Sequence, residues 1–185
     1  VGNLWALRHH LGHLSLSPLA DPSRAANEGC LGGGGIDGEI GYRGGETLYA
    51  ARRALPAVDD RGNRCPTGDA KITVAGDLPC SKVIHAVGPR FGWSENLVDH
   101  ADKLELLEAA YKNAMERAYE NELKSVGFCI LSAGIFRGGC PLKVVIEKGL
   151  ETIAKNTYPG LAPVVFCGFT PQEHAQLCAL TPISL

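Results

Sequence analysis

The chain has 185 residues, of which 45% are hydrophobic and 21% charged, and its formal net charge at pH 7 is −2. This composition is typical of a soluble globular protein, and the length suits one domain over residues 1–185. The charge gives no electrostatic reason for tight binding to a nucleic-acid backbone. No apolar run approaches the roughly 20 residues that span a bilayer. Arg8, His9 and His10 interrupt the apolar start, which is unlike a signal peptide. We therefore expect a soluble monomer without a membrane partner.

The seven cysteines lie at irregular spacing and form no CxxC pair. This usage argues against a disulfide framework and favours a reducing compartment inside the cell, cytoplasm or nucleus, with the cysteines acting as small packing residues. His9, His10 and His13 lack the Cys or carboxylate partners of a metal site, so no metal is expected. His85 lies in an apolar stretch and is expected to be a hydrogen-bonded core residue. A thiol nucleophile paired with it is the alternative, but the sequence singles out no cysteine for that role.

The expected elements follow from periodicity and from the positions of proline and glycine. Pro18 and Pro22 should disturb the strand that precedes Ala25, because proline cannot donate to a ladder. In chain order we expect one or two strands within 5–16, a helix starting near 36–40 and helical spacing over 46–55 that Pro56 ends, strands at 71–74 and 82–87, a helix over 100–121, a buried strand at 125–131, a helix from Pro141, a strand at 163–169 and a helix over 171–180. Strands alternating with helices predict an α/β fold with a mainly parallel sheet covered on both faces.

Two loops have the composition of ligand-binding loops. The first runs from Asn27 to Gly35 and ends in four consecutive glycines, Gly32, Gly33, Gly34 and Gly35, before Ile36 and a helix start. Glycine lets backbone N–H groups approach a ligand, and amides at a helix N-terminus favour an anionic phosphate. The second comprises Ser132, Ala133, Gly134, Ile135, Phe136 and Arg137, after the expected buried strand. Together they would hold a pyrophosphate from two sides. A tolerant glycine linker is the alternative for either loop.

Common nucleotide motifs are absent. The chain contains no GxxxxGK[ST] P-loop, and four contiguous glycines do not match the spaced Rossmann fingerprint. No cofactor is implied. Arg137 would clamp a phosphate with its guanidinium, unless it is simply a solvated residue at a loop tip.

Four stretches in order resemble signatures of macrodomains of the MacroD type. They are AANEGCLGGGGIDG at 25–38, RCPTGDAKIT at 64–73, VIHAVGP at 83–89 and SAGIF at 132–136. The resemblance extends from about Leu4 to Gln176. It implies a three-layer α/β/α sandwich with a mixed, mainly parallel sheet and an ADP-ribose cleft. The implied partner is ADP-ribose or an ADP-ribosylated protein.

The resemblance also implies site residues. Asn27 and Asp37 match the family's asparagine and catalytic aspartate, and would position the distal ribose and a water aimed at its C1″ ester. A carboxylate that favours a helix N-terminus is the other reading of Asp37. Phe136 matches an aromatic residue that packs over the distal ribose, and Phe169 is placed to stack on adenine, although a core position would explain either aromatic residue.

Three departures separate this chain from the family pattern. His13 stands where an aspartate normally accepts a hydrogen bond from the adenine amino group, which puts adenine selectivity in question. Arg24 replaces the first asparagine of the family's VNAAN segment. Gly41 replaces the histidine of its GAIH run, and Gly41, Gly44 and Gly45 should weaken the helix.

Three hypotheses about function follow from this resemblance. The first is a hydrolase that acts at the distal ribose, removing mono-ADP-ribose from acidic side chains or deacetylating O-acetyl-ADP-ribose. The second is a non-catalytic reader of ADP-ribose, and the third an enzyme that processes ADP-ribose 1″-phosphate or a cyclic phosphate. Asn27 and Asp37 favour the first, the changes at Arg24 and Gly41 favour the second, and Arg137 motivates the third.

Overall fold

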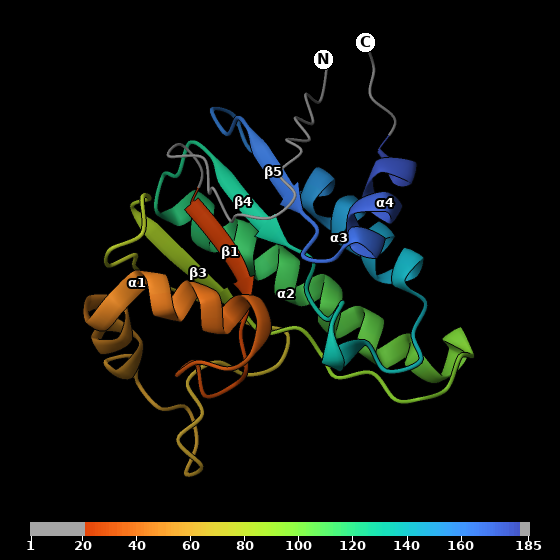
Figure 1. Cartoon of the computed structure of the whole chain (residues 1–185), viewed down its shortest axis with the longest axis horizontal. Coiled ribbons are helices and arrows are strands. Elements are labelled where there is room, and N and C mark those ends of the chain that lie inside the picture. Colours follow the sequence, from red (N-terminus) through yellow and green to blue (C-terminus); the bar gives the residue numbers. More distant parts are fainter. Residues whose placement is uncertain (1–20, 182–185) are drawn as a thin grey trace.

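A computed structural model describes residues 21–181 of the chain (Figure 1). The strands expected within 5–16 and the expected ligand residue His13 lie outside the described residues. So do His9 and His10, on which the question of a metal site depended.

Within the described part of the chain, five strands form one sheet. They are β1 (Asp21–Ala25), β2 (Ala70–Val74), β3 (Lys82–Ala86), β4 (Val126–Cys129) and β5 (Val164–Cys167), in the order β2-β3-β1-β4-β5. β1 is parallel to both β3 and β4, and β4 is parallel to β5. β2 is antiparallel to β3. The sheet is therefore mixed and mainly parallel, as predicted.

The helices cover both faces of this sheet. They are α1 (Gly35–Arg53), α2 (Ala101–Glu120), α3 (Leu142–Lys155) and α4 (Pro171–Leu180), with short 3-10 turns at Leu97–His100 and Ile135–Arg137. From β1 to β3 the chain moves along the sheet in one direction, and from β3 to β4 it moves in the opposite direction. Because such crossovers are right-handed, α1 and α2 lie on opposite faces of the sheet. α2 and α3 pack together, and α4 contacts α3 (Figure 1). The result is the expected three-layer α/β/α sandwich.

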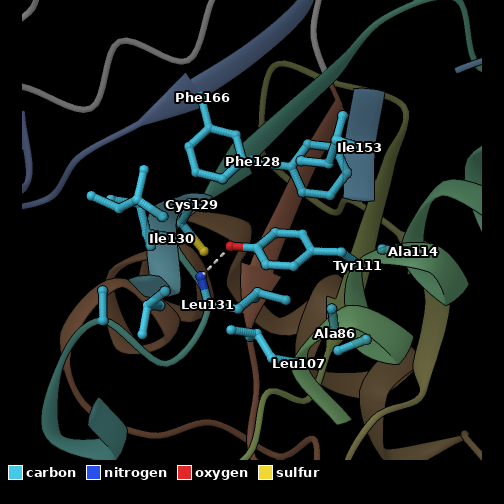
Figure 2. Close-up of a cluster of buried hydrophobic side chains, with 14 of the residues drawn as sticks. Ala86, Leu107, Tyr111, Ala114, Phe128, Cys129, Ile130, Leu131, Ile153 and Phe166 are labelled. Atoms are coloured by element: carbon cyan, nitrogen blue, oxygen red, sulfur yellow. Dashed lines mark hydrogen bonds between the residues drawn. The ribbon is translucent and has the colours of Figure 1, made fainter. Parts of the chain in front are cut away.

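The main core lies between the sheet and the helices α2 and α3. Tyr111 of α2 is fully buried at its centre, with its ring 5.9 Å from that of Phe128 and 6.0 Å from that of Phe166 (Figure 2). Helix α3 approaches this ring through Gly149, where an added Cβ would lie 2.8 Å from the Tyr111 Cζ atom. The buried residues of α2 and α3 thus form this core together with the sheet.

The first strand corrects one prediction. β1 contains Pro22, which pairs in register with Gly127, and the strand lies between two others rather than at an edge. Because β3 and β4 hold the strand from both sides, the missing N–H of one proline does not prevent pairing. The two helical stretches expected at 36–40 and 46–55 are joined in α1, with Gly45 in a non-helical conformation between them.

Candidate functional site

The candidate site lies at one edge of the sheet. Since β1, β3 and β4 are parallel neighbours, their carboxyl ends meet at this edge, and the loops at 26–34, 87–96 and 130–141 follow them (Figure 1). Loops in this position commonly bind ligands in α/β folds. Both glycine-containing loops predicted from the sequence are therefore on the same edge and follow adjacent strands.

The first loop is held by its own asparagine. The Asn27 side-chain amide donates to the Gly32 carbonyl at 2.8 Å, and the Cys30 amide donates to the Asn27 carbonyl at 2.9 Å. Gly32 has φ +119° and Gly35 φ +59°, in the region that disfavours side chains, and Cys30 also has a positive φ of 55°. Gly33, Gly34 and Gly35 are exposed. The loop thus presents bare backbone to solvent at the start of α1.

Asn27 and Asp37 converge beneath this loop. A Cβ added to Gly33 would lie 3.2 Å from the Asp37 Oδ2 atom and 3.4 Å from the Asn27 Nδ2 atom. Asp37 lies in the first turn of α1 and is only 4% exposed. The two residues expected to carry chemistry are therefore neighbours, but the carboxylate is largely covered.

A buried arginine that the sequence analysis did not single out contacts this carboxylate. Arg52, 1% exposed, donates from Nη2 to the Asp37 Oδ1 atom at 2.9 Å and from Nε to the Cys30 carbonyl at 2.6 Å. The ion pair is almost fully removed from solvent, with side-chain exposures of 1% and 6%. Helical spacing alone gave no signal for this contact, because the paired residues are 15 positions apart.

The second loop is fixed to the core at its start. The Leu131 amide donates to the hydroxyl of Tyr111 at 2.8 Å (Figure 2). The next residue, Ser132, has a φ of 57° and donates from its hydroxyl to the Pro89 carbonyl at 2.7 Å. Gly88 lies against this hydroxyl, since an added Cβ there would collide with Ser132 Oγ. Ser132 and Ala133 are buried, whereas Gly134 and Ile135 are exposed.

The aromatic and basic residues of this loop have distinct surroundings. Phe136 is half-buried, and the guanidinium of Arg90 lies over its ring, 4.8 Å from the centroid. Arg90 is exposed and was not identified from the sequence. Arg137 donates from Nη1 to the Cys140 carbonyl at 2.9 Å, so its side chain is part of the loop's own structure. The cation over the Phe136 ring is thus contributed by the neighbouring loop.

Phe169 follows β5 and is 58% exposed, which rules out the alternative of a core position. The segment that carries it is held by the start of α4, where the Phe169 amide donates to Glu173 Oε2 at 2.7 Å. The Glu173 amide in turn donates to the Thr170 hydroxyl at 3.2 Å. This arrangement is similar to a capping box and leaves the aromatic ring at the surface.

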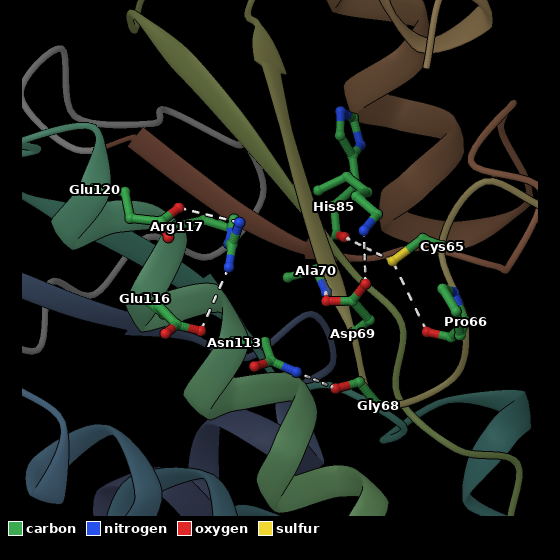
Figure 3. Close-up of polar contacts among 11 residues, drawn as sticks. Cys65, Pro66, Gly68, Asp69, Ala70, His85, Asn113, Glu116, Arg117 and Glu120 are labelled. Carbon is green, nitrogen blue, oxygen red and sulfur yellow. Dashed lines mark hydrogen bonds and ion pairs between the residues drawn. The ribbon is translucent and has the colours of Figure 1, made fainter. Parts of the chain in front are cut away.

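The RCPTGDAKIT segment supports the site from β2. The Asn113 side chain donates to the Gly68 carbonyl at 2.8 Å (Figure 3). The Gly68 amide donates to the Val87 carbonyl at 2.8 Å. Partial burial acts to raise the pKa of Asp69, but hydrogen bonds from Lys71 and from the Ala70 amide outweigh it and hold that pKa below its ordinary value. The segment thus links α2 to the end of β3, just before Gly88.

The expected role of His85 is confirmed. Its ring is fully buried, and Nε2 lies 2.8 Å from the hydroxyl of Thr73 on β2. Four of the seven cysteines, Cys30, Cys65, Cys129 and Cys140, are buried, which agrees with the expected packing role. Among residues 21–181, no helix is both long and apolar enough to cross a membrane.

This sheet and these loops are those of a macrodomain. A family model for the Macro domain matches residues 24–148. The chain is 36% identical over 153 residues to an O-acetyl-ADP-ribose deacetylase of Klebsiella pneumoniae, covering 82% of each chain, and 40% identical over 149 residues to one of Citrobacter koseri, covering 80% and 78%. The chain belongs to the macrodomain family.

Solved structures agree with this assignment. The macrodomain of Oceanobacillus iheyensis with ADP superposes with a TM-score of 0.72 at 30% identity, covering 87% of this chain and 82% of that one. The macrodomain of Trypanosoma brucei in complex with ADP-ribose gives a TM-score of 0.70 at 29% identity, covering 88% and 63%.

Proposed function

We propose that this protein binds ADP-ribose at the edge formed by the loops after β1, β3 and β4, and that it hydrolyses a bond at the distal ribose. The substrates would be mono-ADP-ribose esters of acidic side chains, or O-acetyl-ADP-ribose. The observation that carries the proposal is the convergence of Asn27 and Asp37 beneath Gly33, next to exposed backbone amides. Relatives named O-acetyl-ADP-ribose deacetylase and a solved macrodomain with ADP-ribose support it.

In this proposal each group has a defined task. Gly32 to Ile36 and Ser132 to Arg137 hold the pyrophosphate with backbone N–H groups, which suit an anion at a helix N-terminus. The exposed ring of Phe169 stacks on adenine, and Phe136 packs on the distal ribose. Asn27 and Asp37 orient a water that attacks the ester, so that free ADP-ribose and a carboxylic acid are released. His13 is proposed to accept a hydrogen bond from the adenine amino group.

A reader without turnover is the competing function. One observation favours it: the Asp37 carboxylate is 4% exposed and is engaged by Arg52 in the described conformation. Hydrolysis then requires that the ester and a water reach this carboxylate beside Gly33. The phosphate-processing hypothesis depended on Arg137, and the bond from that guanidinium to the Cys140 carbonyl leaves it without particular support. We further propose that residues 1–185 act as one monomeric domain in a reducing compartment.

The test is hydrolysis of a carboxylate-linked mono-ADP-ribosylated protein, followed by mass spectrometry of the released product. Asp37→Asn is preferable to Asp37→Ala, because it keeps the shape of the side chain beside the buried Arg52. Glu39→Gln is the matched control, since it changes a carboxylate on the same helix that is paired with Arg43 at the surface.

Release of ADP-ribose by the wild type and by Glu39→Gln, but not by Asp37→Asn, would support the hydrolase. Absence of release by a wild-type preparation that binds ADP-ribose in calorimetry would reject hydrolysis of this linkage and favour the reader. Absence of binding would reject the proposal as a whole.

A further inference from the structure

The buried guanidinium of Arg52 joins two parts of the proposed site. Through Nη2 it contacts the Asp37 carboxylate at 2.9 Å, and through Nε it contacts the carbonyl of Cys30 at 2.6 Å. Cys30 lies in the first loop with a φ of 55°, between Asn27 and the four glycines. One side chain thus contacts both the carboxylate expected to orient water and the backbone expected to hold phosphate.

The contact exists because α1 is not straight. In a regular helix the Cα atoms of residues 15 positions apart would be about 22 Å apart, far beyond the reach of an arginine and an aspartate side chain. At Gly45 the backbone takes φ 63° and ψ −166°, and this kink turns the second half of α1 back toward the first. The kink is held by the turn between β2 and β3, where the Asp77 amide donates to the Gly44 carbonyl at 3.0 Å.

Two glycines lie beside the guanidinium. A Cβ added to Gly41 would lie 3.0 Å from Arg52 Nη1, tighter than ordinary contact, and one added to Gly32 would lie 3.8 Å from both Nη atoms. Gly41 is the position where the family pattern has histidine, and in this chain the space beside it is filled by Arg52. A side chain at Gly41 would therefore require the guanidinium of Arg52 to shift by a few tenths of an ångström.

We propose that Arg52 is a positioning residue, which holds the Asp37 carboxylate and the first loop in one fixed arrangement. The part of this proposal that concerns turnover rests on the proposed function. At 1% exposure Arg52 does not touch the substrate, so it acts through Asp37 and Cys30. A guanidinium suits this task because its planar fork of donors bonds two acceptors at once, which the single ammonium of lysine does with poorer geometry.

The experiment compares the wild type with Arg52→Met, Arg52→Lys and the control Arg53→Met. The control removes an arginine at the next position of the same helix, whose ion pair with Glu46 is at the surface. Arg52→Lys keeps a cation beside Asp37 and serves if Arg52→Met does not fold. Amide hydrogen exchange over residues 29–35 is measured by mass spectrometry, and turnover of the carboxylate-linked substrate is measured at saturation.

We expect exchange in the loop to rise by about tenfold or more in Arg52→Met and less in Arg52→Lys, with Arg53→Met within about twofold of the wild type. Exchange in the β2–β3 sheet pair serves as the measure of global stability and should change less than exchange in the loop. Unchanged loop exchange in a folded Arg52 variant overturns the proposal, and so does a rise that is equal throughout the chain.

Turnover separates this proposal from the proposed function. If the wild type hydrolyses the substrate, kcat should fall about tenfold or more in Arg52→Met with a smaller change in KM. An unchanged kcat in folded Arg52→Met would overturn the positioning role in turnover. If the wild type does not turn over, the proposed function fails, and loop exchange alone decides the role of Arg52.

Discussion

At the scale of single residues, the four glycines of the first loop are not equivalent. Gly33 faces the side chains of Asn27 and Asp37, whereas a Cβ added to Gly34 would meet nothing within 4 Å. Gly34 also has an extended backbone, with φ −89° and ψ −177°, which a β-branched residue adopts without strain. Substitution of Gly33 therefore tests the packing of the loop, whereas substitution of Gly34 tests the access of a ligand to it.

The first prediction concerns Gly34→Val. The folded protein should have an unchanged melting temperature, but its affinity for ADP-ribose should fall by about 100-fold, or about 2.7 kcal/mol, because the added methyl groups keep the phosphate away from the amides. Calorimetric titration and thermal unfolding measure the two quantities. Gly33→Val should weaken binding and also lower the melting temperature, because it displaces Asn27 and Asp37. Undiminished affinity in folded Gly34→Val would contradict the assignment of this loop to the pyrophosphate.

The proximity of residues in the candidate site was predictable where the signal was local. The spacing of Asn27, the glycine run and Asp37 lies within one short motif, and the structure brings these residues together. Arg52 was missed because its contact with Asp37 depends on the kink at Gly45, which in turn depends on the distant turn at Asp77. Arg90 was missed for a similar reason, since it reaches Phe136 from a different loop.

At the scale of elements, the kink in α1 gives the second prediction. Gly45 has φ 63° and ψ −166°, a conformation almost confined to glycine, and an added Cβ would collide with the Asp77 carboxylate. Gly45→Ala should therefore lower the free energy of unfolding by about 1–3 kcal/mol or more. ADP-ribose affinity should fall as well, since the kink delivers Arg52 to the loop. Urea denaturation and calorimetry provide the measurements.

Gly160→Ala is the control for this change. Gly160 also has a positive φ, of 88°, but an added Cβ there would meet nothing within 4 Å, and the residue lies in the segment between α3 and β5. The control substitution should lower the free energy of unfolding by about 1 kcal/mol and leave the affinity for ADP-ribose unchanged. Equal effects of the two substitutions on affinity would mean that the kink does not act on the site.

The third prediction tests how α2 supports the second loop. Tyr111→Phe removes the hydroxyl that accepts the Leu131 amide at 2.8 Å, and it leaves a buried N–H without this partner. The free energy of unfolding should fall by about 1–3 kcal/mol, and ADP-ribose should bind more weakly because Ser132 and the following residues lose their anchor. Tyr158→Phe is the control, since its hydroxyl donates to the Leu123 carbonyl away from this loop. Loss of affinity in both variants would argue against a specific anchor.

Among the elements, the sequence was informative for the helices and for the two strands at the sides of the sheet, and misleading for one central strand. The helix expected over 171–180 is α4 (Pro171–Leu180), and α2 differs by one residue at each end from the prediction. Pro22 suggested a disturbed strand, but β1 forms because its neighbours β3 and β4 supply pairing on both sides. Tertiary contacts of this kind override the local preference of a single residue.

At the scale of the whole molecule, the buried thiols couple stability to pH. A hydrogen bond with Cys30, and then burial, raise the pKa of the Cys65 thiol far above its ordinary value. Burial also raises the pKa values of Cys140 and Cys167. In the unfolded chain a thiol ionises near pH 8.5, so above that pH the folded state binds more protons than the unfolded state. Stability from these groups is complete below about pH 8.5 and is lost as the pH rises further.

We therefore expect the free energy of unfolding to fall by about 1 kcal/mol between about pH 8.5 and 9.5 because of Cys65, with further losses from Cys140 and Cys167. Urea denaturation under reducing conditions at several pH values measures the fall. Cys65→Ala should make it smaller by about 1 kcal/mol, while the difference between variant and wild type stays constant between about pH 6 and 7.5, where the thiol is protonated in both states. A parallel fall in wild type and variant above pH 8.5 would show that Cys65 ionises as readily in the folded protein as in the unfolded chain. That result would contradict the closed packing of Cys65 with Cys30 in the cluster that they form with Ala26 and Val87.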